Sequence, residues 1–352
     1  MAYAVGCDGT RFAEGAVFFE SPLMTTETTN PVAASSESQP LLLILSNVEQ
    51  HHRDQLAAQL PTLGQIYAPT AEAAQAAIAE HGARVQAVLT IGPIGLTAAQ
   101  IDALPALQIA CALGAGYERI DVAYARSKGI VVANGAGTND SCVADHTLAL
   151  VLGSIRQLPF YDQKVRAGVW RTNLPLAQGV TGKRLGILGL GTIGRKIALR
   201  AQAFEMEVGY HNRSAKNDVP YPYFDNLLAL AEWADVLVVA TPGGPATQHL
   251  VNAEVLEALG AKGLLVNIAR GSVVDTQALA NALESGVLGA AALDVYESEP
   301  VAPKELLHLS NVLLTPHIAG WSPESVQATI DRFIANVQAH LAGKEPVSPV
   351  YA

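Results

Sequence analysis

A glycine-rich segment near the middle of the chain constrains the fold most strongly. Residues 185–188 form an apolar run, and residues 189–194, which read GLGTIG, follow at once. The pattern GxGxxG between a strand and a helix is typical of the first βαβ unit of a dinucleotide-binding fold. The first glycine permits a tight turn, the second lets the backbone approach a pyrophosphate, and the third lets helix and strand pack closely. We therefore predict strand, turn, helix and second strand over residues 185–214, with phosphates bound where the helix begins, near Thr192.

The end of the second predicted strand indicates which dinucleotide this unit would bind. Residues 207–210 form that strand, and His211, Asn212, Arg213 and Ser214 follow it. A site for NAD usually carries Asp or Glu here, which bonds the ribose 2′-hydroxyl. Asn, Arg and Ser instead offer hydrogen bonds and a guanidinium that can hold a 2′-phosphate. We therefore predict NADP as the cofactor, with NADPH preferred over NADH; the alternative is a solvated turn that happens to contain an arginine.

Composition and net charge exclude several classes of protein. The chain has 352 residues, 50% of them hydrophobic, which is enough for two domains with large cores. A formal net charge of −10 argues against non-specific binding to nucleic acid or to an anionic membrane. No stretch reaches the roughly 18 consecutive apolar residues of a membrane-spanning helix. Cys7, Cys111 and Cys142 form no CxxC pair, so we expect a reducing compartment, the cytoplasm, and no metal site.

The first 39 residues differ from the rest of the chain. Residues 25–31 and 35–40 are rich in Thr, Ser and Pro, a composition typical of disorder. No basic segment leads into a long apolar one near the N-terminus, so we expect no signal peptide. We therefore expect residues 1–39 to be a disordered extension, and leave open whether Met24 is the true start.

From Leu41 onward, apolar runs alternate with segments of helical periodicity, which predicts parallel sheets covered by helices on both faces. The predicted strands before the glycine motif are 41–45, 85–89, 107–113 and 130–133. The six predicted strands from the motif onward are 185–189, 207–210, 236–240, 264–268, 290–295 and 312–314. The predicted helices are 71–80, 98–103, a long helix from 142 to about 166, and an amphipathic helix at 323–341.

Three charged or titratable groups follow strands of the second set. Arg270 comes directly after strand 264–268, Glu299 follows 290–295, and His317 follows 312–314. In open α/β sheets, ligands bind outside the carboxyl ends of the strands. A buried arginine there is costly unless it meets an anion. That anion is either a ligand carboxylate or an internal acid, for which Asp275 is a candidate.

Together these groups meet the needs of a 2-oxoacid that accepts a hydride. The substrate carboxylate needs a cation, which Arg270 supplies. The carbonyl oxygen needs a proton, and a histidine such as His317 is suited to donate it because the ordinary pKa of imidazole lies near neutrality. Glu299, hydrogen-bonded to that imidazole, would favour the imidazolium and hold its orientation. A lone histidine is usually structural, so the hypothesis rests on the three groups together.

Several motifs occur in a characteristic order along the chain. They are GAGYERID at 114–121, VADH at 143–146, the glycine motif at 189–194, ARG at 269–271, DV at 294–295 with EP at 299–300, and TPH at 315–317. From about Leu41 to the C-terminus, the chain thereby resembles the D-isomer-specific 2-hydroxyacid dehydrogenases, and within them the NADPH-preferring glyoxylate/hydroxypyruvate reductases. The resemblance implies an α/β protein of two doubly wound parallel-sheet lobes. A Rossmann cofactor domain (140–317) would be inserted into a flavodoxin-like substrate domain (40–139 and 318–352).

The resemblance also implies which residues hold substrate and cofactor. The family's catalytic Arg, Glu and His fall on Arg270, Glu299 and His317. Its carboxylate-binding loop falls on residues 91–95, where Pro93 lacks an N–H but Ile94 and Gly95 keep theirs. The substrate-binding residues would be Gly92, Ile94, Gly95, Arg270 and His317. The cofactor-binding residues would be Gly189, Leu190, Gly191, Thr192, Ile193, Gly194, Asn212, Arg213, Ser214, Thr241, Ile268, Ala269, Arg270, Asp294 and Gly320, with Asp294 contacting the nicotinamide amide.

Two tryptophans bear on assembly and on the substrate. Members of the family are usually homodimers formed through the cofactor domain, and Trp170 looks like the tryptophan that approaches the partner's substrate site; a plain core or interface role is equally open. Trp321, just past His317, stands where some reductases have a small or polar residue. It either narrows the substrate pocket or packs on the hinge between the lobes.

The sequence therefore predicts NADPH-dependent reduction of small 2-oxoacids, with glyoxylate and hydroxypyruvate first, to D-2-hydroxyacids, and with His317 as proton donor. A larger 2-oxoacid such as 2-ketogluconate is the alternative substrate, because nothing in the sequence fixes the length of the substrate tail. An alternative of another class is a dinucleotide-sensing binding protein of the same fold, similar to transcriptional corepressors that resemble this family. The intact set of Arg270, Glu299 and His317 argues against pure sensing.

Overall fold

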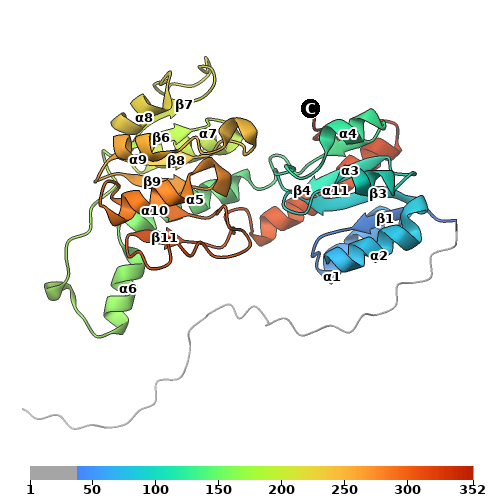
Figure 1. Ribbon diagram of the computed structural model, residues 1–352, viewed down its shortest axis with the longest axis horizontal. Coiled ribbons are helices and arrows are strands. Elements are labelled where there is room, and N and C mark those ends of the chain that lie inside the picture. The colour runs from blue at the N-terminus through green and yellow to red at the C-terminus, as the bar shows by residue number, and fades with distance from the viewer. Residues whose placement is uncertain (1–37, 352) are drawn as a thin grey trace, which may run out of the picture. The chain divides into compact units, whose positions relative to one another are not determined.

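The computed structural model describes residues 38–351. The predicted N-terminal extension at 1–39, apart from its last two residues, and the question of Met24 lie outside the described residues, as does Cys7. The described chain contains two parallel β-sheets, each flanked by helices (Figure 1). The α/β fold expected from the alternating apolar runs is therefore confirmed.

The first sheet has the strand order β2-β1-β3-β4-β5, which is the flavodoxin-like order. Its strands are β1 (Leu41–Ile44), β2 (Gly64–Tyr67), β3 (Val85–Ile91), β4 (Ile109–Leu113) and β5 (Val131–Ala133). The helices that follow them are α1 (Gln50–Gln59), α2 (Ala71–His81), α3 (Ala98–Asp102) and α4 (Val122–Ser127). Strand β1, which lies between β2 and β3, is buried on both faces: Leu41 and Leu43 pack on one side, and Leu42 and Ile44 on the other.

The C-terminal part of the chain completes this first sheet. Helix α11 (Pro323–Leu341) has the bounds expected from its apolar periodicity, and Ser322 caps it in a capping box with Ser325. Its apolar side chains, such as Phe333 and Val337, pack against the face of the sheet that carries Leu42 and Ile44. The tail then pairs antiparallel with β5, through Ala133 and Pro349. The lobe boundaries at 139/140 and 317/318 remain a prediction.

The second sheet has the order β11-β10-β9-β8-β6-β7. Its strands are β6 (Arg184–Leu188), β7 (Glu207–His211), β8 (Val236–Val239), β9 (Leu264–Asn267), β10 (Ala290–Leu293) and β11 (Val312–Leu314). A single parallel bridge joins Tyr210 to Tyr223 at the outer edge of β7. Residue 223 thereby takes the place of the third strand in the Rossmann order 3-2-1-4-5-6. The six strands predicted from the glycine motif onward all form.

Helices cover both faces of the second sheet. Helices α8 (Leu227–Trp233), α9 (Ala253–Leu259) and α10 (Thr276–Glu284) pack on one face, and α5 (Asp140–Ile155) and α7 (Thr192–Ala203) on the other. Short 3-10 turns occur at Gly82–Arg84, Arg171–Asn173, Pro245–Thr247 and Gly271–Val273. No helix among residues 38–351 is both long and apolar enough to cross a membrane.

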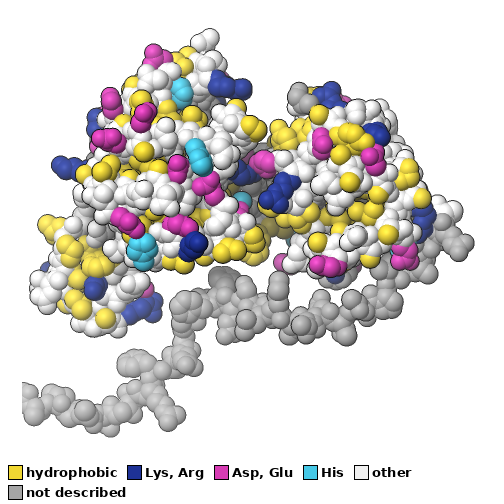
Figure 2. All heavy atoms as spheres, viewed as in Figure 1, with side chains coloured by type: hydrophobic (Ala, Val, Ile, Leu, Met, Phe, Trp, Pro, Cys, Tyr) yellow, Lys and Arg dark blue, Asp and Glu magenta, His cyan; other side chains and the backbone are white. Residues whose placement is uncertain are grey.

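The long helix predicted from 142 to about 166 is wrong in one respect, because the chain forms two helices there. Helix α5 ends at Ile155 and α6 spans Leu158–Arg166. Gln157 between them adopts a left-handed conformation (φ 52°), which ends one helix, and a proline opens the next. The apolar side chains of α6 and the segment after it are largely exposed, and hydrophobic atoms gather there at the lower left of Figure 2.

Candidate active site

The three glycines of the motif have the geometry that a dinucleotide needs. Gly189 has φ +103°, and a Cβ on it would lie 2.7 Å from the carbonyl oxygen of Ala240. A Cβ on Gly194 would lie 2.3 Å from the carbonyl oxygen of Gly189, which explains why helix α7 can pack so closely on the turn. Around Gly191, by contrast, nothing lies within 4 Å of the position of a Cβ. That space lies at the N-cap of α7, where free N–H groups favour an anion.

A pocket of about 620 Å³ opens beside this turn, a volume that suits a small-molecule or cofactor site. Of the predicted cofactor residues, it is lined by Gly189, Leu190, Gly191, Asn212, Arg213, Ser214 and Thr241. Thr192, Ile193 and Gly194 form the first turn of α7, and Ile268, Ala269, Arg270, Asp294 and Gly320 lie outside its lining. Lys216 and the loop 242–247, which no sequence motif indicated, complete the wall. Within residues 38–351, no cluster of His, Cys, Asp or Glu is arranged to hold a metal ion.

The residues after β7 divide into two roles. The side-chain oxygen of Asn212 accepts a hydrogen bond from the backbone N–H of Leu190 at 2.7 Å, so this residue fastens the glycine turn to the end of β7. Arg213 and Lys216 make no ion pair with any acidic side chain of the described chain. The acid nearest to them in sequence, Asp218, is bound to Arg195 at 2.8 Å, and this bond lowers the pKa of Asp218. Two cations thus line the pocket without a direct ion pair to a carboxylate of the described chain, although the charge of Lys216 also helps to lower the pKa of Asp218.

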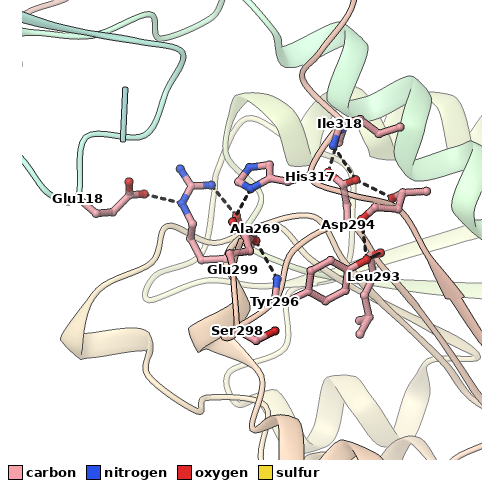
Figure 3. A network of polar contacts seen from close by, with 12 residues as sticks. Glu118, Ala269, Leu293, Asp294, Tyr296, Ser298, Glu299, His317 and Ile318 are labelled. Atoms are coloured by element: carbon pink, nitrogen blue, oxygen red, sulfur yellow. Dashed lines mark hydrogen bonds and ion pairs between the residues drawn. The ribbon is translucent and has the colours of Figure 1, made fainter. Parts of the chain in front are cut away.

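His317 and Glu299 form the direct contact that the sequence analysis expected. The Nδ1 atom of His317 lies 2.8 Å from Oε2 of Glu299, as Figure 3 shows. The other oxygen of Glu299 accepts the backbone N–H of Tyr296 at 2.9 Å. Burial alone would raise the pKa of Glu299, but the bonds from His317 and Tyr296 outweigh it and hold that pKa below its usual range. Glu299 is therefore a carboxylate at neutral pH and can stabilise an imidazolium.

The backbone of the His317 loop is fastened by Asp294. His317 has φ +55°, which is an unfavourable backbone conformation for a residue with a side chain. Its N–H donates to the backbone carbonyl oxygen of Asp294 at 2.8 Å. The buried carboxylate of Asp294 accepts from Thr315 Oγ1, from the N–H of Ile318 and from the N–H of Ala319, at 2.6, 2.9 and 2.8 Å (Figure 3).

A histidine also contributes to this network. His146 Nε2 lies 3.0 Å from Thr315 Oγ1 and 3.5 Å from Asp294 Oδ1. Burial would raise the pKa of Asp294, but His146, Thr315 and the two N–H groups together keep it low. Asp294 is thus bound to the protein through both oxygens. This structural role comes in addition to the contact with the nicotinamide amide that the family resemblance implies.

Arg270 lies where β9 ends, and its internal partner is Glu118, not Asp275. Its Nε donates to Oε1 of Glu118 at 2.7 Å, and its Nη1 donates to the carbonyl oxygen of Ala269 at 2.6 Å. Asp275 instead caps helix α10 by accepting the N–H of Ala278. The suggestion of Asp275 was wrong because a carboxylate at a helix N-cap bonds the free N–H groups there. Glu118 belongs to the motif at 114–121, but it lies 152 positions from Arg270, and no sequence pattern links the two residues.

The loop at residues 91–95 departs from expectation. The N–H groups of Ile94 and Gly95, expected to remain free for a substrate carboxylate, both donate to the carbonyl oxygen of Ile91, at 3.1 and 2.8 Å. They close the turn after β3, and Gly95 has φ +72°. The Gly92 N–H donates to no acceptor within residues 38–351, so it is the only one of the three predicted substrate-loop donors that is not used inside the turn.

Comparison with known proteins decides the family. A sequence model described as the NAD-binding domain of D-isomer-specific 2-hydroxyacid dehydrogenases matches residues 148–319. Glyoxylate/hydroxypyruvate reductase A of Arabidopsis thaliana is 41% identical over 271 residues, which cover 77% of this chain and 87% of that protein. The chain belongs to the D-isomer-specific 2-hydroxyacid dehydrogenase family. The 2-ketogluconate reductase of Gluconobacter oxydans is also similar, at 38% identity over 76% of this chain and 86% of its own.

Solved structures of this dehydrogenase family share the fold. The NADPH-dependent glyoxylate/hydroxypyruvate reductase of Sinorhizobium meliloti, solved with NADP and malonate, is 34% identical with a TM-score of 0.79. The match covers 89% of this chain and 97% of that one. The resemblance read from the motifs, and its placement in the glyoxylate/hydroxypyruvate reductase branch, are therefore confirmed. The chain has the fold of an oxidoreductase with a nucleotide-binding Rossmann domain.

Proposed function

We propose that this dehydrogenase reduces small 2-oxoacids with NADPH, and that glyoxylate and hydroxypyruvate are its leading substrates. The observation that carries the proposal is the 2.8 Å contact between His317 and Glu299 in a family of 2-hydroxyacid dehydrogenases. When bound, the reduced nicotinamide supplies a hydride to the carbonyl carbon. The product is a D-2-hydroxyacid wherever the reduced carbon is a stereocentre.

The residues of the chain supply the proton and the position. Because Nδ1 of His317 faces the Glu299 carboxylate, the protonated ring keeps its Nε2–H for the substrate carbonyl oxygen. Glu299 stabilises the charged ring before transfer and fixes its plane. Arg270 binds the substrate carboxylate, with the free N–H of Gly92 as a second donor. The backbone of Ile94 and Gly95 shapes the turn that presents Gly92.

We propose NADP as the cofactor because Arg213 and Lys216 line the pocket and neither forms an ion pair within the described chain. Two such cations beside Ser214 suit a 2′-phosphate and would contribute little to the binding of a 2′-hydroxyl. The Arg213→Asp enzyme should lose most of its preference for NADPH over NADH. The KM for the cofactor should change, and the KM for the oxoacid should stay the same. A ratio of the two kcat/KM values that stays within about twofold of the wild type would contradict this assignment.

A second candidate substrate is 2-ketogluconate, which the similar Gluconobacter enzyme supports. The Trp321 side chain is 73% exposed, so it does not seal the site against a longer substrate tail.

A homodimer formed through the cofactor lobe is also proposed, because exposed apolar side chains gather on α6 and near Trp170. The free thiols of Cys111 and Cys142 support a reducing compartment such as the cytoplasm.

The decisive experiment measures oxidation of NADPH and of NADH with glyoxylate, hydroxypyruvate, pyruvate and 2-ketogluconate. We expect the highest kcat/KM with NADPH and one of the first two acids. His317→Ala should lower kcat by about two to four orders of magnitude at saturating substrate. Tight dinucleotide binding without turnover of any of the four acids would favour a dinucleotide-sensing protein instead.

A further inference from the structure

The arginine proposed to bind the substrate carboxylate already binds a carboxylate of the chain itself. Arg270 Nε donates to Glu118 Oε1 at 2.7 Å, and Glu118 approaches from a segment 152 positions away in sequence (Figure 3). A guanidinium binds a carboxylate side-on through Nε and one Nη together. Glu118 therefore occupies one of the two donors that this mode of substrate binding needs.

Glu118 also lies against the other predicted part of the carboxylate site. A Cβ on Gly92 would lie 2.9 Å from Oε2 of Glu118, and a Cβ on Gly116 would lie equally close to the same atom. A Cβ on Gly116 would also lie 2.1 Å from Nη2 of Arg270. Because Gly92 and Gly116 have no side chains, a carboxylate fits between the guanidinium of Arg270 and the backbone of Gly92. Glu118 fills this space with the group that a 2-oxoacid would bring.

The contact has few features of a structural ion pair. The side chains of Arg270 and Glu118 are 33% and 36% exposed, so water can replace either partner. No other donor among residues 38–351 bonds Glu118. Asp294, by comparison, is buried and accepts three hydrogen bonds. Separating Arg270 from Glu118 leaves no buried charge unpaired, and a partly exposed pair is readily exchanged for another.

We propose that Glu118 is an internal competitor for the substrate carboxylate. It binds Arg270 while the site is free of substrate, and it must release the guanidinium before a 2-oxoacid can bind side-on. Glu118 is a positioning residue that acts through Arg270, and the inference rests on the function proposed above. Its consequence is a KM for the oxoacid that is higher than the site alone would give, with no effect on the chemical step.

The test replaces Glu118 by its neutral isostere. In Glu118→Gln, the KM for glyoxylate and hydroxypyruvate should fall by about two- to fivefold, the range expected for a partly exposed ion pair. The kcat and the KM for NADPH should stay within about twofold of the wild type. Glu72→Gln, on helix α2, removes the same charge from the same lobe and should leave all three constants unchanged. Glu118→Ala should also lower the KM for the oxoacid. It is included because a Gln side chain can still accept a hydrogen bond from Arg270 Nε through its amide oxygen.

Binding of oxamate, an unreactive 2-oxoacid analogue, separates this inference from the proposed function. Calorimetric titration of the NADPH-loaded enzyme should give a Kd for Glu118→Gln that is lower by the same factor as the KM. An unchanged or higher KM and Kd would overturn the inference, because Glu118 would then be inert or would orient Arg270 for the substrate. If the wild type reduces no 2-oxoacid, the proposed function fails, but the Kd for oxamate still tests whether Glu118 competes for Arg270. Tighter binding by Glu118→Gln then supports the competition, and equal, weaker or absent binding overturns it.

Discussion

At the scale of single residues, His317 depends on a carboxylate that does no chemistry. Asp294 holds the loop by three hydrogen bonds that use both of its oxygens. Without Asp294, the N–H groups of Ile318 and Ala319 would lose their acceptor close to the reacting atoms, whereas Thr315 would keep its contact with His146. His317 itself has φ +55°, and its N–H donates to the backbone carbonyl oxygen of Asp294, so Asp294 holds the loop on both sides of the ring.

Replacing Asp294 by Asn should therefore damage stability and catalysis together. An amide has one acceptor oxygen, and its NH2 group would face the N–H of Ala319 or of Ile318. We expect a loss of about 1–3 kcal/mol in the free energy of unfolding, measured with urea, and a fall in kcat of at least about tenfold. Thr315→Val removes one donor and leaves the other two bonds intact, so its loss should be smaller. An Asp294→Asn enzyme with wild-type kcat would show that the loop holds His317 without this carboxylate.

The sequence identifies some site residues more readily than others. Arg270, Glu299 and His317 could be predicted because each follows a parallel strand, and the carboxyl ends of such strands lie along one edge. The partnership of Arg270 with Glu118 could not, because it joins two sheets whose loops have no local pattern in common. The N–H groups of Ile94 and Gly95 were misjudged because a turn can use its own donors internally.

At the scale of elements, a second His–Glu pair fastens the loop after β10. His249 Nε2 lies 2.7 Å from Glu297 Oε1, and Glu297 Oε2 accepts from Thr276 at the start of α10. The hydrogen bond to Glu297 raises the pKa of His249, with a smaller contribution from Asp275. This pair joins the segment that carries Glu299 to helix α10 and to the segment before α9.

The pair should make stability depend on pH in a definite direction. Because the folded pKa of His249 is raised, its stabilisation is complete below about pH 6.5, the ordinary pKa of histidine, and is lost as the pH rises through the higher folded value. His249→Asn keeps a residue that tolerates the φ of 48° and removes the charge. Urea unfolding should show a deficit of at most about 1 kcal/mol at pH 6 that shrinks by pH 9. A deficit that grows with pH would contradict the assignment.

Most elements were predictable because buried parallel strands are apolar runs. Strand β2, with the sequence GQIY and every residue only partly buried, was missed because an edge strand needs no such run. The break between α5 and α6 was missed because apolar periodicity continues across Gln157, while one left-handed residue suffices to end a helix. The strand-like bridge at Tyr223 is a single residue pair, too short to leave a pattern.

At the scale of the whole molecule, the exposed apolar side chains around α6 have no partner in the described chain. Leu158 and Val165 on α6 are 55% and 56% exposed, Trp170 is 66% exposed, and Leu176 is 98% exposed. Helix α6 has no buried residue, although one of its faces is apolar. A helix with such a face is stable in water when another surface covers it. A second copy of the chain is the partner that the family resemblance implies.

A charge on this face should therefore break the proposed dimer. The wild type should have about twice the 36.8 kDa mass of one chain in sedimentation equilibrium, and Val165→Glu should shift the mass towards that of a monomer. The physical reason is that an unpaired carboxylate is costly to bury in an apolar interface. Val347→Glu is the matched control, because Val347 is 57% exposed and lies near the C-terminus, away from α6. That variant should keep the wild-type mass. A wild type that sediments as a monomer at micromolar concentration would instead show that the apolar face of α6 is left uncovered in solution.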